Sequence, residues 1–115
     1  MDNRTTLDIW TFREQTLDPN GLIGFDVEAT DGGIGSIDEA TGDVGRSHLI
    51  VDTGPWIFGK KVLLPAGVVD RVDLDTETVF LARTKDEIKN APEFDEALRD
   101  DEAYRGRVGD YYGGF

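Results

Sequence analysis

The residues best suited to chemistry are few in this sequence, and its single histidine is the first of them. His48 follows Ser47 directly, and a serine beside a histidine suggests the nucleophile and general base of a hydrolase. Neighbouring residues of a strand point to opposite faces, however, so these two side chains cannot form such a pair. We therefore expect His48 to be a packed or surface residue, and we predict no catalytic residues and no enzymatic activity.

Four acidic residues close together in the sequence suggest a calcium site. Asp70, Asp73, Asp75 and Glu77 offer the hard oxygen ligands that Ca²⁺ prefers. A calcium loop also needs a glycine at its sharp bend and a bidentate glutamate at its end. Counted from Asp73, Thr78 stands where that glycine would be, and no glutamate follows in register. We expect a solvated turn between two strands, and we predict no metal site and no cofactor.

The glycine-rich segment at residues 32–35 has the composition of a phosphate-binding loop. Such loops depend on the N-terminus of a helix that follows the glycines, whereas the pattern of a strand follows here. Asp31 and Gly32 are instead typical of a tight hairpin turn, because glycine tolerates a positive φ. We predict a β-hairpin at this position.

Short alternating or apolar segments indicate the strands that would carry these residues. The period of two is typical of half-buried strands, and turn residues separate the segments. An antiparallel barrel or sandwich of about six strands is therefore predicted, in a mainly β fold. The segments lie at 23–29, 35–38, 49–51, 62–64, 68–74 and 78–82.

The pattern changes after residue 83. Thr84 and Glu87 have the spacing of a capping box, in which each side chain bonds the other residue's backbone N–H at the start of a helix. We predict a short helix that runs to about Asn90 and ends before Pro92. Asp95 is expected to begin a further turn through residue 98, and the charged residues 100–102 are expected to be solvated and mobile.

The chain is strongly acidic, with 24 Asp and Glu against 12 Lys and Arg and a net charge of −12. Nucleic-acid affinity depends on Lys and Arg displacing counterions, so we predict no nucleic-acid partner. No apolar segment approaches the about 18 residues that span a bilayer, and residues 1–20 lack the apolar core of a signal peptide. We expect a cytoplasmic protein without membrane insertion.

Four segments, 24–28, 31–38, 51–65 and 84–92, together resemble a PRC-barrel domain, the small β-barrel named after the photosynthetic reaction centre. The resemblance implies an all-β barrel at 21–95, an N-terminal extension at 1–20 and an acidic, aromatic tail at 96–115. The ending Gly-Asp-Tyr-Tyr-Gly-Gly is similar to that of small bacterial proteins of this type. The resemblance implies architecture only, because members of the family do different jobs.

Aromatic residues concentrate near both ends of the chain and in the loop at 55–59. Such residues are enriched at protein interfaces, and we expect extended aromatic termini that dock onto a partner. The alternative is that they pack on the chain's own barrel. The candidate interaction residues are Trp10, Phe12, Trp56, Phe58, Tyr104, Tyr111, Tyr112 and Phe115.

Three functions follow from these features. The first is a non-catalytic interaction or assembly module that forms a homodimer and binds a further, unidentified protein. The second is a barrel that senses a small molecule or a metal ion. The third is implied by the resemblance alone, and is an accessory role in an electron-transport or ribosome-maturation complex.

Overall fold

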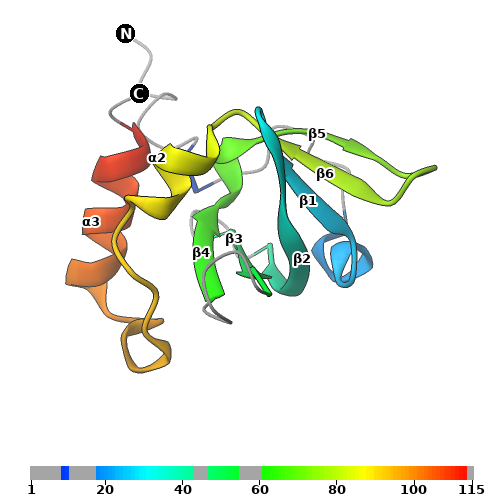
Figure 1. Ribbon diagram of the computed structural model, residues 1–115. Coiled ribbons are helices and arrows are strands. Elements are labelled where there is room, and N and C mark those ends of the chain that lie inside the picture. Colours follow the sequence, from blue (N-terminus) through cyan, green and yellow to red (C-terminus); the bar gives the residue numbers. More distant parts are fainter. Residues whose placement is uncertain (1–8, 11–17, 43–46, 55–60, 114–115) are drawn as a thin grey trace, which may run out of the picture.

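A computed structural model describes residues 9–10, 18–42, 47–54 and 61–113 of the chain. Six strands form one sheet in the order β4-β3-β2-β1-β6-β5 (Figure 1). The strands are β1 (Asp26–Ala29), β2 (Gly32–Thr41), β3 (His48–Asp52), β4 (Lys61–Pro65), β5 (Val69–Asp73) and β6 (Thr78–Leu81). The helices of these described residues are α2 (Lys85–Lys89) and α3 (Glu102–Gly113), with short 3-10 turns η1 (Pro19–Leu22), η2 (Ala66–Val68) and η3 (Glu96–Leu98).

The predicted strands are confirmed, and the hairpin at Asp31 and Gly32 is the clearest case. β1 and β2 are antiparallel, and Ala29 lies opposite Gly32 in the ladder. Gly32 has a φ of 139°, a backbone angle at which a side chain would be strained. The glycine therefore makes the hairpin, and it does not form a phosphate loop.

The sheet is mixed, so the prediction of an antiparallel arrangement is wrong for one pair of strands. β1 pairs with β6 in parallel, with Asp26 beside Thr78 and Glu28 beside Phe80. Hydrophobic spacing reveals which residues form strands but carries no information on the direction in which distant strands meet.

The sheet ends at β4 and β5, and no ladder joins these two edges in the described part of the chain. The closed barrel that we predicted is therefore not confirmed. The two edge strands are nevertheless consecutive in sequence, separated only by η2 (Ala66–Val68). The sheet thus curls until its edges approach each other at this corner.

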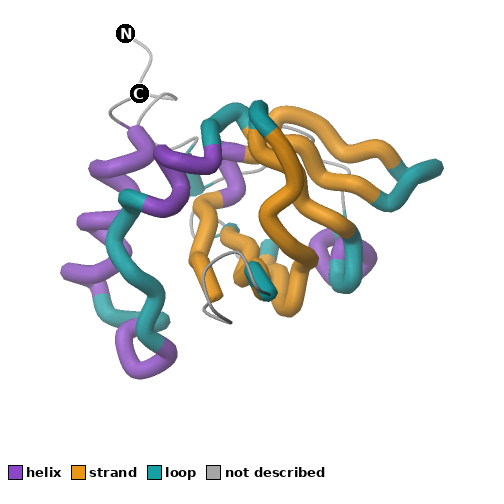
Figure 2. Tube along the Cα trace, in the orientation of Figure 1, coloured by secondary structure: helices purple, strands orange, loops and turns teal. Residues whose placement is uncertain are grey.

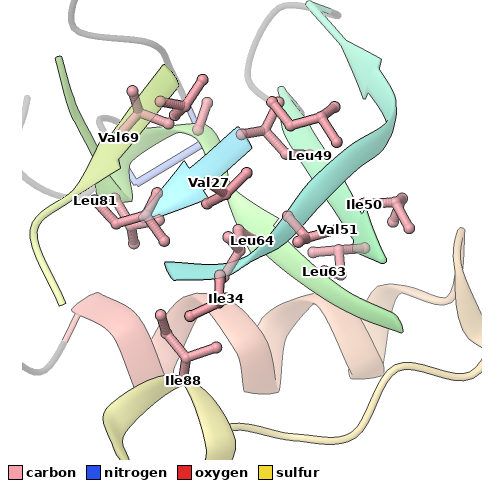
Figure 3. Close-up of a cluster of buried hydrophobic side chains, with 14 of the residues drawn as sticks. Val27, Ile34, Leu49, Ile50, Val51, Leu63, Leu64, Val69, Leu81 and Ile88 are labelled. Carbon is pink, nitrogen blue, oxygen red and sulfur yellow. The ribbon is translucent and has the colours of Figure 1, made fainter. Parts of the chain in front are cut away.

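One apolar cluster receives side chains from all six strands, α2 and α3. Figure 3 shows its residues from the strands and Ile88 of α2. The middle of β3 is buried on both faces, since Leu49, Ile50 and Val51 are each 0% exposed. A strand that is buried on both faces packs against the interior of the sheet on one face and against another part of the chain on the other.

None of the helices in the described residues has the length and apolar character to cross a bilayer.

The predicted capping box of α2 is confirmed. The Thr84 backbone N–H donates to Glu87 Oε1 at 2.8 Å, and the Glu87 N–H donates to Thr84 Oγ1 at 3.1 Å. Asp95 begins η3 as expected, because its carboxylate accepts from the Ala97 N–H at 2.9 Å. These short-range bonds satisfy backbone donors that have no partner inside the helix.

The predicted extended conformation of the C-terminal tail is wrong for residues 102–113, which form the helix α3 (Figure 2). Asp101 starts it, since its carboxylate accepts from the Tyr104 N–H at 2.9 Å. The charged residues at 100–102 are exposed as expected, and Glu102 is the first residue of the helix. Glycines made a helix improbable on propensity alone, and packing of α3 on the sheet overrides that preference.

Candidate interaction site

Four of the eight candidate interaction residues lie in the described part of the chain, and they all belong to one region around α3. They are Trp10, Tyr104, Tyr111 and Tyr112. Phe12, Trp56, Phe58 and Phe115 lie outside the described residues. The role of all eight in binding a partner stays a prediction.

The face of α3 that meets the sheet is made by residues four positions apart. Tyr104, Val108 and Tyr112 are 1%, 1% and 0% exposed and belong to the main apolar cluster. Residues at this spacing lie on one side of a helix. The rings of Tyr104 and Phe94 are 6.5 Å apart between centroids. This part of the aromatic tail therefore packs on the chain's own sheet.

Trp10 lies against the middle of α3. The Arg105 guanidinium is 4.3 Å from the centroid of the Trp10 ring, a cation–π distance. A Cβ atom at Gly109 would be 3.0 Å from Trp10 Nε1. The Trp10 carbonyl accepts from the Ser47 N–H at 3.0 Å, which ties this segment to the start of β3.

Two polar contacts hold the C-terminal end of α3. Arg83 Nη2 donates to the Tyr112 carbonyl at 2.9 Å, and the Tyr111 hydroxyl donates to the Glu87 carbonyl. A cation at this end of a helix also meets the negative end of its dipole. The contacts join α3 to α2 and to the segment between β6 and α2, which no short-range sequence signal indicates.

A bidentate ion pair holds the segment that leads into α3. Arg99 Nη1 and Nη2 each donate to an oxygen of Glu39 at 2.8 Å, and Nη2 also reaches Glu96 at 3.0 Å. The hydrogen bonds from Arg99 hold the pKa of the Glu39 carboxyl below its usual range. Residues 39 and 99 are 60 positions apart, so sequence spacing could not have identified this pair.

Two phenol hydroxyls on α3 are buried without hydrogen-bond partners among the described residues. They are those of Tyr104 and Tyr112. Burial raises the pKa of Tyr104 to about 12 and raises that of Tyr112 as well. An unpaired polar group inside a protein carries a desolvation cost. The position of these hydroxyls is therefore unfavourable in an otherwise apolar contact.

A small pocket opens beside this end of α3, between β4 and the segment after α2. Its volume is about 70 Å³, well below the roughly 300–1,000 Å³ of ordinary small-molecule sites. A water needs only about 10–15 Å³ by this measure, so the pocket has room for a few waters or a small ion. The lining includes Lys61, Leu63, Lys89, Pro92, Phe94 and Tyr112.

The residues first considered for chemistry have structural roles in the described fold. His48 is buried in β3 opposite Pro65. Asp73 accepts from the N–H groups of Thr76 and Asp75 at 3.2 and 2.9 Å. These bonds, that from Thr76 above all, hold the pKa of Asp73 below its usual range. Within the described residues, no group of three or more His, Asp or Glu side chains is placed to hold a metal, and the acidic segment forms the predicted turn between two strands, β5 and β6.

No family model matches this chain, and no curated protein matches it. The solved structures similar in fold include that of RimM from Pseudomonas aeruginosa, described as a candidate 16S ribosomal RNA processing protein. The TM-score is 0.53 at 19% sequence identity, over 64% of this chain and 48% of that one. The likeness concerns the fold alone, and the chain matches about half the length of that protein. RimM has a PRC-barrel domain, which agrees with the resemblance seen in the sequence.

This likeness corrects the prediction of partners. Net charge led us to predict no nucleic-acid partner, yet a protein with this fold is described as acting in 16S ribosomal RNA processing. Net charge describes an average field and does not determine which assembly a protein joins. The expected homodimer likewise has no support in the structure or in this likeness.

Proposed function

We propose that this chain is a non-catalytic assembly module with a PRC-barrel-type fold, and that it serves as an accessory factor in maturation of the small ribosomal subunit. The observation that carries the proposal is the fold likeness to RimM, with a TM-score of 0.53 over 64% of the chain. Because the match spans 48% of that protein, this chain would supply one part of such a factor's activity.

The charge of the chain suggests how it would contact such a particle. Proteins bound to ribosomal RNA need Lys and Arg to neutralise phosphates, so they offer basic surfaces. A chain of net charge −12 complements such a surface, and this complementarity speeds association and selects the partner. The proposed contact is therefore a basic protein component of the immature particle.

The non-catalytic part of the proposal is supported by the environment of the titratable groups. Strongly shifted groups in the described residues are Tyr104 and Tyr112, which are buried in the apolar core. Catalytic acids and bases commonly have shifted pKa values, and they lie where a substrate can reach them. Burial of these phenols in the core is the arrangement of structural residues.

Co-sedimentation tests the proposal. Purified full-length protein would be centrifuged through sucrose with mature small subunits and, separately, with immature small-subunit particles from an assembly-deficient strain. We expect co-migration with the immature particles, weaker as salt is raised from 50 to 300 mM because the contact is electrostatic. Mature subunits are the matched control. Crosslinking followed by mass spectrometry would show whether the contact is with protein or RNA. Absence from both particles at low salt would reject the function.

The small pocket favours a second candidate function, the sensing of a small ligand. Lys61 and Lys89 stand at its lining with Glu93, so a short anionic group is the ligand to test. A ligand at 100 times its Kd stabilises a protein by about 2.7 kcal/mol. A thermal-shift panel of acetate, phosphate, Ca²⁺ and Mg²⁺ would detect this, and equal melting temperatures across the panel would reject the candidate.

A further inference from the structure

The hairpin of β5 and β6 carries an exposed leucine at its tip. The hairpin extends away from the rest of the sheet, on the opposite side of the molecule from α3 (Figure 1). Leu74 follows β5 directly and is 67% exposed. Among the described residues, the other large apolar side chain that is exposed is that of Ile23, at 51%. The surface of the described chain thus shows two large aliphatic side chains.

These two side chains belong to the same end of the sheet. β1 begins beside the start of β6, in parallel, and β5 ends opposite that start. Ile23 stands three residues before Asp26, and Leu74 stands three residues before Glu77. The Asp26 N–H donates to the Glu77 carbonyl at 3.0 Å, so these two acidic residues lie between the aliphatic ones. This region, here called the hairpin end, comprises Ile23, Asp26, Leu74, Asp75 and Glu77.

The charge around the hairpin end has one sign. Segments 22–29 and 69–80 contain six acidic residues and one basic residue, a net charge of −5. The basic residue is Arg71, and its guanidinium is 3.9 Å from the centroid of the Phe80 ring. The carboxylates at the hairpin end are those of Asp26, Asp75 and Glu77, and all three residues are exposed. The aliphatic side chains are therefore surrounded by negative charge.

The turn that presents Leu74 is stiff and strained. The Asp73 carboxylate accepts from the N–H groups of Asp75 and Thr76 at 2.9 and 3.2 Å. These bonds fix the turn before any partner binds, which lowers the entropy cost of binding. Glu77 has a φ of 52°, a region in which glycine is favoured over other residues. A strained residue kept on an exposed turn points to a role for its side chain.

We propose that the hairpin end is the surface through which this chain binds a basic segment of another protein, in which Lys or Arg flanks an apolar residue. Apolar groups with a polar rim are typical of contact sites, and the carboxylates select a cationic partner. At this surface the same charges disfavour a phosphate backbone and a second copy of this acidic chain. The proposal deepens the proposed function and rests on it for the partner, a basic protein of the immature particle.

Peptide binding tests the surface without the particle. The probes are two labelled synthetic peptides, one of Lys-Leu-Arg repeats and one of Lys-Ser-Arg repeats, measured by fluorescence anisotropy with the full-length protein. Leu74→Ser should weaken binding of the leucine peptide about fivefold, because apolar contact is lost, and should leave the serine peptide unchanged. Asp75→Asn should weaken both about threefold. Asp110→Asn, which removes the same charge from an exposed position on α3, is the matched control and should change neither.

A substitution at Glu77 separates binding from folding. Glu77→Gly should raise the melting temperature, because glycine adopts the observed φ without strain, and should weaken both peptides about threefold through the lost carboxylate. Glu77→Gln should weaken binding equally and leave the strain in place. A loss of binding caused by damage to the fold would instead come with a lower melting temperature.

Site-specific crosslinking identifies what lies against the hairpin end in the particle. The chain contains no cysteine, so Thr76→Cys, at the exposed tip, can carry a single photo-crosslinker. We expect it to attach to a basic protein of the immature small subunit, and Asp110→Cys on α3 should not attach to that protein.

The proposal is overturned if neither peptide binds, or if Leu74→Ser binds the leucine peptide as tightly as the wild type does. A crosslink from Thr76→Cys to RNA or to a second copy of the chain would overturn it as well. Equal co-sedimentation of the wild type and Leu74→Ser would reject the hairpin end and leave the proposed function intact. Peptide binding that depends on Leu74, without co-sedimentation, would reject that function and retain the surface.

Discussion

Tyr104 shows how burial changes the chemistry of one residue. Its hydroxyl has no partner among the described residues, and burial raises its pKa to about 12, against about 10 in an unfolded chain. The charges of Arg107 and Arg105 lower this pKa, and that of Asp95 raises it, each by less than burial does. The neutral phenol is thus favoured by folding, and the ionised one is disfavoured.

This shift predicts a pH dependence of stability. The contribution of Tyr104 is fully present below about pH 10 and is lost as pH rises toward about 12, because the unfolded chain ionises first. The melting temperature of the wild-type protein should fall more steeply between about pH 10 and 12 than that of Tyr104→Phe. Parallel curves for the two proteins would show that the phenol ionises equally in both states.

The pair of Glu39 and Arg99 is a second case in which a residue's role depends on a distant partner. Replacing Glu39 with Gln should lower the free energy of unfolding by about 1 kcal/mol. Bidentate pairs of Arg and a carboxylate are strong, but this pair is partly exposed and solvent weakens it. Urea denaturation at pH 7 would measure the loss. Asp38→Asn, which removes an exposed partner of Lys61, is the matched control and should cost less. An equal or larger loss in that control would contradict the special role of Arg99.

Among the elements, α2 is defined locally by its capping box. Thr84→Ala removes the oxygen that accepts from the Glu87 N–H and should cost about 1 kcal/mol of stability, whereas Thr84→Ser should retain most of it. Chemical denaturation of the three proteins decides this. If serine proves as costly as alanine, the threonine methyl group matters and the cap does not.

The contact between β2 and β3 depends on a glycine that sequence alone does not single out. Gly35 has a φ of 151°, and a Cβ there would be 2.0 Å from the carbonyl oxygen of Asp52. Gly35→Ala should therefore destabilise the fold by at least about 2 kcal/mol, through overpacking and backbone strain. Gly33→Ala, in open space on the same strand, is the control. Similar denaturation midpoints for both variants would refute this placement of the strand.

For the whole molecule, the net charge of −12 predicts self-repulsion that salt relieves. The melting temperature should rise as NaCl is increased from 10 to 500 mM, because the screening length falls below about 10 Å above 0.1 M. Calorimetry in NaCl and in Na₂SO₄ at equal ionic strength would separate screening from the general stabilising effect of sulfate. A melting temperature independent of NaCl would show that the acidic groups are too far apart to repel.

The sequence by itself determined those features that depend on neighbouring residues. The hairpin at Asp31 and Gly32, the capping box of Thr84 and Glu87, and the six strands all follow from side chains within a few positions of one another. Their physical causes are backbone sterics, hydrogen bonds over three residues and a period of two, and each of these is visible in a short window of sequence.

Tertiary structure alone decided the parallel pairing of β1 with β6, the bond between Glu39 and Arg99, and the packing of α3. Residues 102–113 contain glycines and charged groups that favour other conformations, and they become a helix because Tyr104, Val108 and Tyr112 pack into the apolar core. That core exists only after distant strands have come together. Burial free energy that depends on the whole fold can thus outweigh local propensity, and the candidate site is built from such long-range contacts.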